Sequence, residues 1–273
     1  MPIERVEALA DPRVDFYREL REGRLLEEHG LFVAESRHVV RRVLQGRRFR
    51  VRSVLLADGA LAELRPELEA LADPPLVLLA PHALLCEIAG YHVHQGCLAV
   101  VERGAPVPLD ALARRAATGR GLIVGIERLG DPANVGSVFR NALAFGADAV
   151  LLAPGGAHPL FRKSVRVSMA ATLAVPFAQA TAWPGDLEKL RAEGYRILAC
   201  VARPDATPLD AFARDASRVV LLFGSEGAGL DAATVSAADA TLTIPVAAAA
   251  DSVNVATASG IVLHHFARLR PLS

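Results

Sequence analysis

The amino-acid sequence predicts an α/β fold in which most strands of the main sheet run parallel. Short apolar runs alternate with amphipathic stretches of helical period, and Gly, Pro, Asn or Ser follows many of the apolar runs directly. Strands separated by helices favour a parallel sheet, because each helix returns the chain to the edge where the previous strand began. Apolar residues make up 52% of the 273 residues, which suffices for the core of one large or two modest domains.

The first hundred residues predict a small alternating α/β unit. It begins with a moderate helical pattern at residues 13–28, which Gly30 ends. The expected elements that follow are a strand at 31–34, a helix from 36, a strand at 51–56, a helix at 60–72, a strand at 76–79, a helix after Pro81 and a strand at 97–101. Residues 106–120 hold Pro106, Pro108 and Gly119 and are interpreted as a linker. We therefore expect domains at residues 1–105 and 121–273.

The alternation is stronger from residue 121 onward. Strands are expected at 122–126, 148–153, 195–201, 219–223 and 240–244, with an extended segment at 173–177. Helices are expected at 134–145, 159–169, 187–193, 230–237 and 253–269. Asn134 is expected to be the N-cap of its helix, because Asn side chains accept hydrogen bonds from the first helical N–H groups.

Bulk composition excludes several classes of protein. The charges balance, with 30 basic and 30 acidic residues, which argues against an unstructured nucleic-acid-binding tail. The three scattered cysteines indicate neither a disulfide framework nor a zinc site. The first ten residues do not resemble a signal peptide, and no apolar run reaches the roughly 18 residues of a membrane span. We expect a cytoplasmic protein that does not enter the membrane.

Familiar catalytic and nucleotide-binding motifs are absent. No G-x-G-x-x-G follows a strand, and neither a P-loop, an H-E-x-x-H nor a G-x-S-x-G motif occurs. His92 and His94 stand two residues apart, but no third ligand accompanies them. We expect a structural or packing role for these histidines and no metal site.

Three turns in the second half predict a single site. They lie at residues 127–140, 223–230, and 244–245 with 252–255, and each follows an apolar run. Since the carboxyl ends of parallel strands lie at one edge of a sheet, these turns are expected to converge there. Each turn alone is also explained as a helix cap or a loose Gly-rich turn, so the functional interpretation depends on the three together.

These three turns resemble the SpoU family of RNA 2′-O-ribose methyltransferases, in the SPOUT superfamily. The resemblance rests on Asp131-Pro132-x-Asn134-x-Gly136-x-x-x-Arg140, on Gly224-Ser225-Glu226-Gly227-x-Gly229-Leu230, and on Ile244-Pro245 followed by Ser252-x-Asn254-Val255. The N-terminal half is similar to the family's L30e-like substrate-binding domain, including residues 30–35 and His94-Gln95-Gly96. The match covers nearly the whole chain.

The resemblance implies S-adenosylmethionine bound in a C-terminal trefoil knot, and a homodimer whose sites form across the interface. It implies that Arg140 is the catalytic arginine and that Asn134, Glu226 and Asn254 line the same site. The cofactor-binding residues that it implies are Val201, Ala202, Gly224, Ser225, Glu226, Gly227, Ile244, Pro245, Ser252 and Val253.

Basic residues in two segments are candidates for contact with RNA phosphates. Residues 36–52 hold seven arginines and no acid, a pattern typical either of phosphate contact or of a solvated helix face. The candidates are Arg37, Arg41, Arg47, Arg48 and Arg50, together with Arg162, Lys163 and Arg166 in the helix expected at 159–169. A ribose 2′-hydroxyl target implies RNA, and the separate N-terminal domain favours ribosomal over transfer RNA.

Two other functions compete with this interpretation. Ala248 stands where the family usually has Gly, and Ala170 where a Gly often follows Ser-Met. A Cβ at residue 248 would narrow the cofactor bend if that backbone needs a positive φ. The main alternative is therefore a catalytically impaired RNA-binding protein with a SPOUT fold. A generic nucleotide-binding α/β enzyme is disfavoured by the three motifs together.

Overall fold

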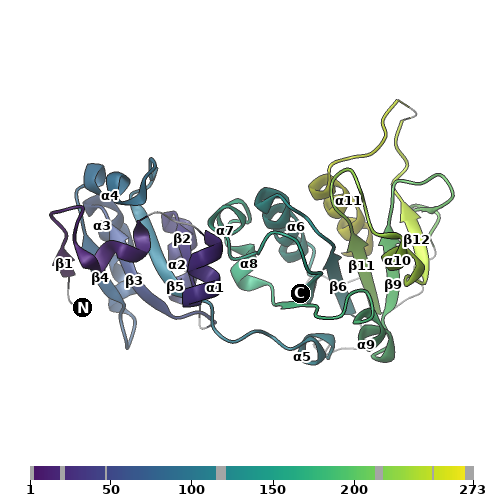
Figure 1. The fold of residues 1–273 in the computed structure, drawn as a ribbon, viewed down its shortest axis with the longest axis horizontal. Helices are drawn as coiled ribbons and strands as arrows, with labels where there is room; N and C mark the ends of the chain where they lie inside the picture. Colours follow the sequence, from purple (N-terminus) through teal and green to yellow (C-terminus); the bar gives the residue numbers. More distant parts are fainter. Residues whose placement is uncertain are drawn as a thin grey trace. The chain divides into compact units, whose positions relative to one another are not determined.

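The chain folds into two compact units in the computed structural model (Figure 1). The structure describes residues 3–18, 22–46, 48–114, 121–212, 218–247 and 249–267. The first unit comprises Met1–Ala105 and Pro159–Leu173, and the second comprises Pro106–His158 and Ala174–Ser273. The segment 159–173 was expected in the second domain, but in the structure it packs with the first unit.

A five-stranded mixed sheet forms the centre of the first unit. Its order is β1 (Ile3–Arg5), β4 (Leu76–Leu79), β3 (Val51–Leu56), β5 (Cys97–Glu102) and β2 (Leu31–Glu35). β1, β4 and β3 are parallel, whereas β5 is antiparallel to both β3 and β2. The alternation of side chains along these strands supplies an apolar layer to each face of the sheet.

Helices cover both faces of this first sheet. The elements are η1 (Pro12–Tyr17), α1 (Glu22–His29), α2 (Arg37–Gln45), α3 (Asp58–Glu69), α4 (His82–Ala89) and α7 (Arg162–Val167). One core cluster joins η1, α1 and α4 to the sheet and includes the fully buried Tyr17 and Leu85. Helices α2 and α3 pack against each other and bury Val40 and Leu64. Helix α7 packs against β2.

The second unit is built on a seven-stranded parallel sheet. Its order is β10 (Thr207–Pro208), β12 (Ala240–Thr243), β9 (Arg196–Cys200), β11 (Arg218–Phe223), β6 (Gly121–Ile126), β7 (Ala149–Leu152) and β8 (Phe177–Gln179). Every neighbouring pair is parallel. The predicted α/β fold with a mostly parallel sheet is therefore confirmed.

The helices of the second unit place two of the predicted motifs side by side. They are α5 (Leu109–Ala113), α6 (Pro132–Ala144), α9 (Leu187–Ala192), α10 (Ala232–Ser236) and α11 (Val255–Ala267), while α8 (Ala171–Ala174) lies at the boundary of the units. Helices α6 and α11 pack together, and Asn141 Nδ2 donates to the Ala256 carbonyl at 2.7 Å and to Ser259 Oγ at 2.9 Å. Among the described residues, no helix is long and apolar enough to cross a membrane.

Two sequence predictions about the bounds of helices and strands are wrong, and the expected linker contains a helix. The helix expected at 13–28 is two elements, η1 and α1. The segment expected to be extended at 173–177 ends the helix α8, and the strand β8 begins only at Phe177. The expected linker at 106–120 contains α5, which forms because it buries Leu112 and Ala113.

The turn between β2 and α2 holds Ser36 in an unusual conformation. Its φ is 86° and its ψ is 147°, a region that residues with a Cβ rarely occupy. The Ser36 N–H donates to the Cys97 carbonyl at 3.2 Å, and Ser36 Oγ accepts from the Val39 N–H at 3.4 Å. The surrounding sheet and the helix cap together impose this backbone conformation.

Replacing Ser36 by Gly is expected to stabilise the first unit by about 1 kcal/mol, because relief of the backbone strain outweighs the small cost of losing the cap. Ser36→Ala keeps the strain and loses the cap, so it is expected to destabilise by about 1 kcal/mol. Urea unfolding of both variants measures the difference. Equal effects of the two substitutions would contradict the strain at Ser36.

Candidate active site

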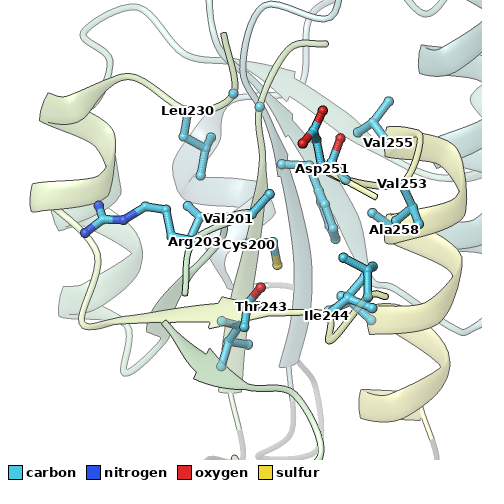
Figure 2. A pocket seen from close by; sticks show the side chains of 18 of the residues that line it. Cys200, Val201, Arg203, Leu230, Thr243, Ile244, Asp251, Val253, Val255 and Ala258 are labelled. Atoms are coloured by element: carbon cyan, nitrogen blue, oxygen red, sulfur yellow. The ribbon is translucent and has the colours of Figure 1, made fainter. Parts of the chain in front are cut away.

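A cavity of about 1080 Å³ opens at the edge of the parallel sheet where strands end (Figure 2). Its walls are the segments that follow β9, β11 and β12, closed by the start of α11. All ten residues expected to bind the cofactor line it: Val201, Ala202, Gly224, Ser225, Glu226, Gly227, Ile244, Pro245, Ser252 and Val253. Parallel strands explain this convergence, since their carboxyl ends share one edge of the sheet.

The Gly-rich loop after β11 is a tight turn that depends on missing side chains. The Ser225 N–H donates to the Gly229 carbonyl at 3.1 Å, and the Gly229 N–H donates to the Ser225 carbonyl at 2.9 Å. A Cβ on Gly224 would lie 2.1 Å from the Gly229 carbonyl carbon and 2.2 Å from the Leu230 nitrogen. Gly227 and Gly229 have φ values of +82° and +69°. The loop therefore requires Gly for both space and backbone conformation.

Three polar side chains, one from each motif, meet at the rim of the cavity. Asn134 Nδ2 donates to Glu226 Oε1 at 2.5 Å, and Asn254 Nδ2 donates to the same oxygen at 2.8 Å. Asn254 Nδ2 also lies 3.3 Å from Asn134 Oδ1. We call Asn134, Glu226 and Asn254 the polar triad. Glu226 and Asn254 line the cavity, so the triad fastens the start of α6 to it.

The cap of α6 differs from the prediction. Asp131 is the N-cap, and its side chain accepts from the Ala133 N–H at 3.0 Å, with Pro132 at the first helical position. Asn134 therefore lies in the first turn of the helix, where its amide reaches Glu226. Asn254 does cap its helix, because its Oδ1 accepts from the Ala256 N–H at 2.8 Å.

Arg140 lies farther along α6 and is exposed. Within the described part of the chain its guanidinium makes no hydrogen bond or ion pair, and it does not line the cavity. The structure of a single chain thus brings together three of the four predicted catalytic residues and leaves Arg140 outside this group.

One more polar residue beside the site, Glu127, had no role predicted from the sequence. Glu127 directly follows β6 and is 2% exposed. Its Oε1 accepts from Trp183 Nε1 and Thr234 Oγ1, each at 2.9 Å, and its Oε2 accepts from the Asp231 N–H at 2.9 Å. These bonds fix the end of β6 to the start of α10. An acid directly after a fully apolar strand was the available sequence signal.

The charged side chains of the cavity favour a cationic ligand. Glu226 and Asp251 supply two carboxylates, and Arg203 supplies the basic group. Arg203 extends away from the other labelled side chains in Figure 2 and forms an ion pair with Asp205, which lowers the pKa of that carboxyl. Burial raises the pKa of the Cys200 thiol to about 12, so this cavity residue is neutral at physiological pH.

The candidate phosphate-binding arginines of α2 are engaged by acids of α3. Arg37 pairs with Glu63, and Arg41 Nε lies 2.6 Å from Glu67 Oε1. The sequence showed no acid within residues 36–52, but the fold supplies acids from another helix. These pairs reduce the positive charge that α2 presents to solvent.

The next two candidates follow α2. The Arg48 guanidinium lies 4.9 Å from the centre of the Phe49 ring. Arg50 is mostly exposed and lies 3.6 Å from an Asp73 oxygen and 3.8 Å from a Glu102 oxygen. At these distances in solvent, the acids leave Arg50 available to other anions.

The basic residues of α7 lie in the first unit. Arg162 Nη1 is 2.6 Å from Glu35 Oε2, and Arg166 Nη1 is 3.6 Å from Glu35 Oε1. Lys163 is exposed between them. Arg47, Ala248 and residues 115–120 of the expected linker lie outside the described residues.

His92 and His94 form an exposed ring cluster with His82. The His92 and His94 rings are 4.9 Å apart, and the His82 and His92 rings are 5.6 Å apart. All three are exposed, so the packing expected of His92 and His94 is limited to contacts among these rings. No group of three or more His, Cys, Asp or Glu among the described residues is arranged to hold a metal ion.

Comparison with known proteins identifies the family. The profile of the SpoU rRNA Methylase family matches residues 121–264, more than half of the chain. The chain belongs to the SpoU rRNA methylase family. The SpoU resemblance is therefore confirmed, and the chain is an RNA methyltransferase by family. An uncharacterized tRNA/rRNA methyltransferase of Mycobacterium tuberculosis is 36% identical over 264 residues, covering 94% of this chain and 89% of the relative.

Solved structures of SpoU relatives share the architecture of both units. The AdoMet-bound rRNA methyltransferase from Sinorhizobium meliloti has a TM-score of 0.82 and 26% identity, covering 99% of each chain. The SpoU methyltransferase AviRb from Streptomyces viridochromogenes, in complex with AdoMet, has a TM-score of 0.77 and 26% identity, covering 95% of this chain and 98% of AviRb. An RNA 2′-O ribose methyltransferase has a TM-score of 0.75 and 26% identity, covering 97% and 98%.

Gly224→Ala is expected to destabilise this SpoU protein by about 3 kcal/mol, since the added Cβ would overlap backbone atoms that have no room to move. Gly130→Ala is the matched control, because no atom lies within 4 Å of its Cβ position. Its effect is expected to stay within about 0.5 kcal/mol. Chemical unfolding measures both, and a Gly224→Ala variant as stable as the control would contradict the close approach.

Proposed function

We propose that the protein transfers a methyl group from S-adenosylmethionine to a ribose 2′-hydroxyl of structured RNA, with ribosomal RNA favoured over transfer RNA. The observation that carries the proposal is the polar triad at the rim of the cavity that follows three parallel strands. The relatives of this chain support the proposal. Two of the similar structures hold AdoMet, and another is an RNA 2′-O ribose methyltransferase.

The cavity fits S-adenosylmethionine in size, backbone character and charge. Its volume of about 1080 Å³ accommodates a nucleoside with an amino-acid arm. Val201, Ile244 and Val253 provide apolar walls for a purine, and the Gly-rich loop offers backbone N–H and C=O groups. Glu226 and Asp251 suit a ligand that carries a sulfonium and an ammonium. The ten lining residues named above would hold it.

When bound, S-adenosylmethionine supplies a methyl group already activated by the sulfonium. The chain must then align the 2′-oxygen with that methyl group, and this positioning is the main contribution that the protein makes to the rate. We propose that the polar triad fixes the start of α6 and so aims Arg140. Arg140 grips the adjacent RNA phosphate with two N–H groups and stabilises the oxygen as its proton leaves to phosphate or water. Guanidinium stays protonated, so Arg140 is not the base.

The position of Arg140 supports assembly of the site from two chains. It is exposed and outside the cavity of its own chain. We propose a homodimer in which the site forms across the interface. Leu143 on α6 and Ile261 on α11, each 41% exposed, supply apolar surface on the two packed helices. Analytical ultracentrifugation tests this state.

We also propose that the C-terminal region forms a trefoil knot and that the first unit is L30e-like.

The choice of RNA is assigned to the first unit, which we propose recognises shape through backbone contacts. Mapping 2′-O-methyl groups in RNA from cells with and without the gene identifies the nucleotide and decides between ribosomal and transfer RNA. The competing function is an RNA-binding protein that has lost catalysis. Calorimetric titration with S-adenosylmethionine separates the two, because an impaired protein would show no binding.

Arg140→Lys is expected to lower kcat by about 100-fold, because lysine keeps the charge but loses the bidentate grip on phosphate. Single-turnover methyl transfer at saturating RNA and S-adenosylmethionine measures the rate. Arg114→Lys, at an exposed arginine of the same unit, is the control and is expected to change kcat by less than about twofold. Retention of most of the rate in Arg140→Lys would rule out the bidentate role.

Arg48 and Arg50, if they contact phosphates, set part of the salt dependence of RNA binding. Replacing both by Gln is expected to make the slope of log K against log salt shallower by about 0.7 for each lost contact. The control replaces Arg24 and Arg65, which form exposed pairs within their own helices and change the net charge equally. An unchanged slope in the Arg48 and Arg50 variant would place the RNA elsewhere.

A further inference from the structure

Glu35 is a buried carboxylate that faces two arginines of α7. It is the last residue of β2, and its side chain is 6% exposed, against 23% for Arg162 and 50% for Arg166. Arg162 donates to one carboxylate oxygen at 2.6 Å, and Arg166 lies 3.6 Å from the other. Each oxygen of Glu35 therefore faces its own guanidinium.

An aromatic ring completes the setting of Arg162. Its guanidinium lies 4.0 Å from the centre of the Tyr91 ring, and the Tyr91 hydroxyl donates to Glu35 Oε2 at 3.5 Å. Burial, and then the charge of Glu35, raise the pKa of Tyr91, so the hydroxyl remains a donor. Arg162 is thus held by a carboxylate at its edge and a ring at its face.

The backbone that carries Glu35 is itself fixed. Glu35 pairs with Leu98 of β5, and the next residue, Ser36, donates its N–H to the Cys97 carbonyl. A second contact holds the other end of the α7 segment, because Arg42 Nη1 donates to the Met169 carbonyl at 3.1 Å. The carboxylate is therefore a rigid reference point for α7.

The charges of this cluster leave a cationic surface. One carboxylate faces two guanidiniums, so these three side chains carry a net positive charge. The acid is buried while Arg166 and Lys163 reach solvent. Such an arrangement suits an RNA phosphate, which meets cations that are already ordered.

We propose that Glu35 is a positioning residue for RNA: it orders the α7 arginines that grip the RNA backbone and does not touch RNA itself. This inference rests on the proposed function, in which Arg162, Lys163 and Arg166 hold phosphates. The proposal predicts a change in RNA affinity opposite to the one that net charge alone predicts. Removing a carboxylate makes the protein more positive and should tighten RNA binding. Removing a positioning residue weakens it.

The decisive variant is Glu35→Gln, compared with Glu28→Gln. Both remove one carboxylate from the first unit, but Glu28 is exposed and pairs with the exposed Arg24 of its own helix. The probe is end-labelled, fragmented total ribosomal RNA, and fluorescence anisotropy measures its binding. Glu35→Gln is expected to weaken binding about tenfold and to raise the KM for RNA with little change in kcat, whereas Glu28→Gln leaves binding unchanged or slightly tighter. Equal or tighter binding in Glu35→Gln overturns the proposal.

Three further variants separate positioning from a merely structural role. The loss of RNA binding in the Glu35→Gln/Arg162→Gln double variant should be smaller than the sum of the two single losses, because part of the effect of Glu35 acts through Arg162. Additive losses would overturn this mechanism. Glu35→Asp keeps the charge and the fold but displaces the carboxylate, so an intermediate loss is expected even if Glu35→Gln unfolds. RNA binding as tight as wild type in Glu35→Asp, together with an unfolded Glu35→Gln, would make the role structural.

The readouts distinguish this proposal from the proposed function. Anisotropy needs no methyl transfer, and calorimetric titration with S-adenosylmethionine should give the same affinity for all these variants. If RNA binding depends on Glu35 but the wild-type protein transfers no methyl group, the proposed function is overturned and the role of Glu35 stands.

Discussion

The site depends on the hydrogen bonds that the Glu226 carboxylate accepts. One of its oxygens accepts hydrogen bonds from Asn134 and Asn254, side chains separated by 120 positions in the sequence. Glu226 reaches both because the loop folds back so that the backbone of Gly229 and Leu230 lies against Gly224. A Cβ at residue 224 would overlap that backbone. The parallel order of β12, β9, β11 and β6 then brings the strand ends together. The hydrogen bonds of Glu226 thus depend on the tight loop at Gly224 and on the order of the strands.

The fold could be predicted well where strands are long and buried. The bounds of β3 and β4 agree with the strands expected at 51–56 and 76–79, because each strand ends in three buried apolar residues, at 54–56 and 77–79. The strands β1 and β10 escaped prediction because two or three residues carry no periodicity. Asn134 was misjudged as a cap because the helix begins three residues earlier, with Asp131 accepting from the Ala133 N–H and Pro132 at the first helical position.

From the sequence, only the segments that line the cavity could be predicted. Turns that follow parallel strands must converge, so the residues of the cavity could be found from sequence order and family motifs. The partners of the charged residues could not. Arg37 and Arg41 find acids on α3, Arg162 finds Glu35, and the donors to Glu127 come from positions 183, 231 and 234. Such pairings exist only after helices pack, and no local pattern encodes them.

The assignment of α7 to the first unit has a consequence for the construction of chimeric proteins. The chain changes unit after residues 105, 158 and 173, so the first unit is assembled from two separated stretches of sequence. Exchange of residues 1–105 alone between relatives would pair a foreign β2 with a resident α7 and break the contact at Glu35. A chimera that exchanges the whole first unit must therefore carry residues 159–173 together with residues 1–105.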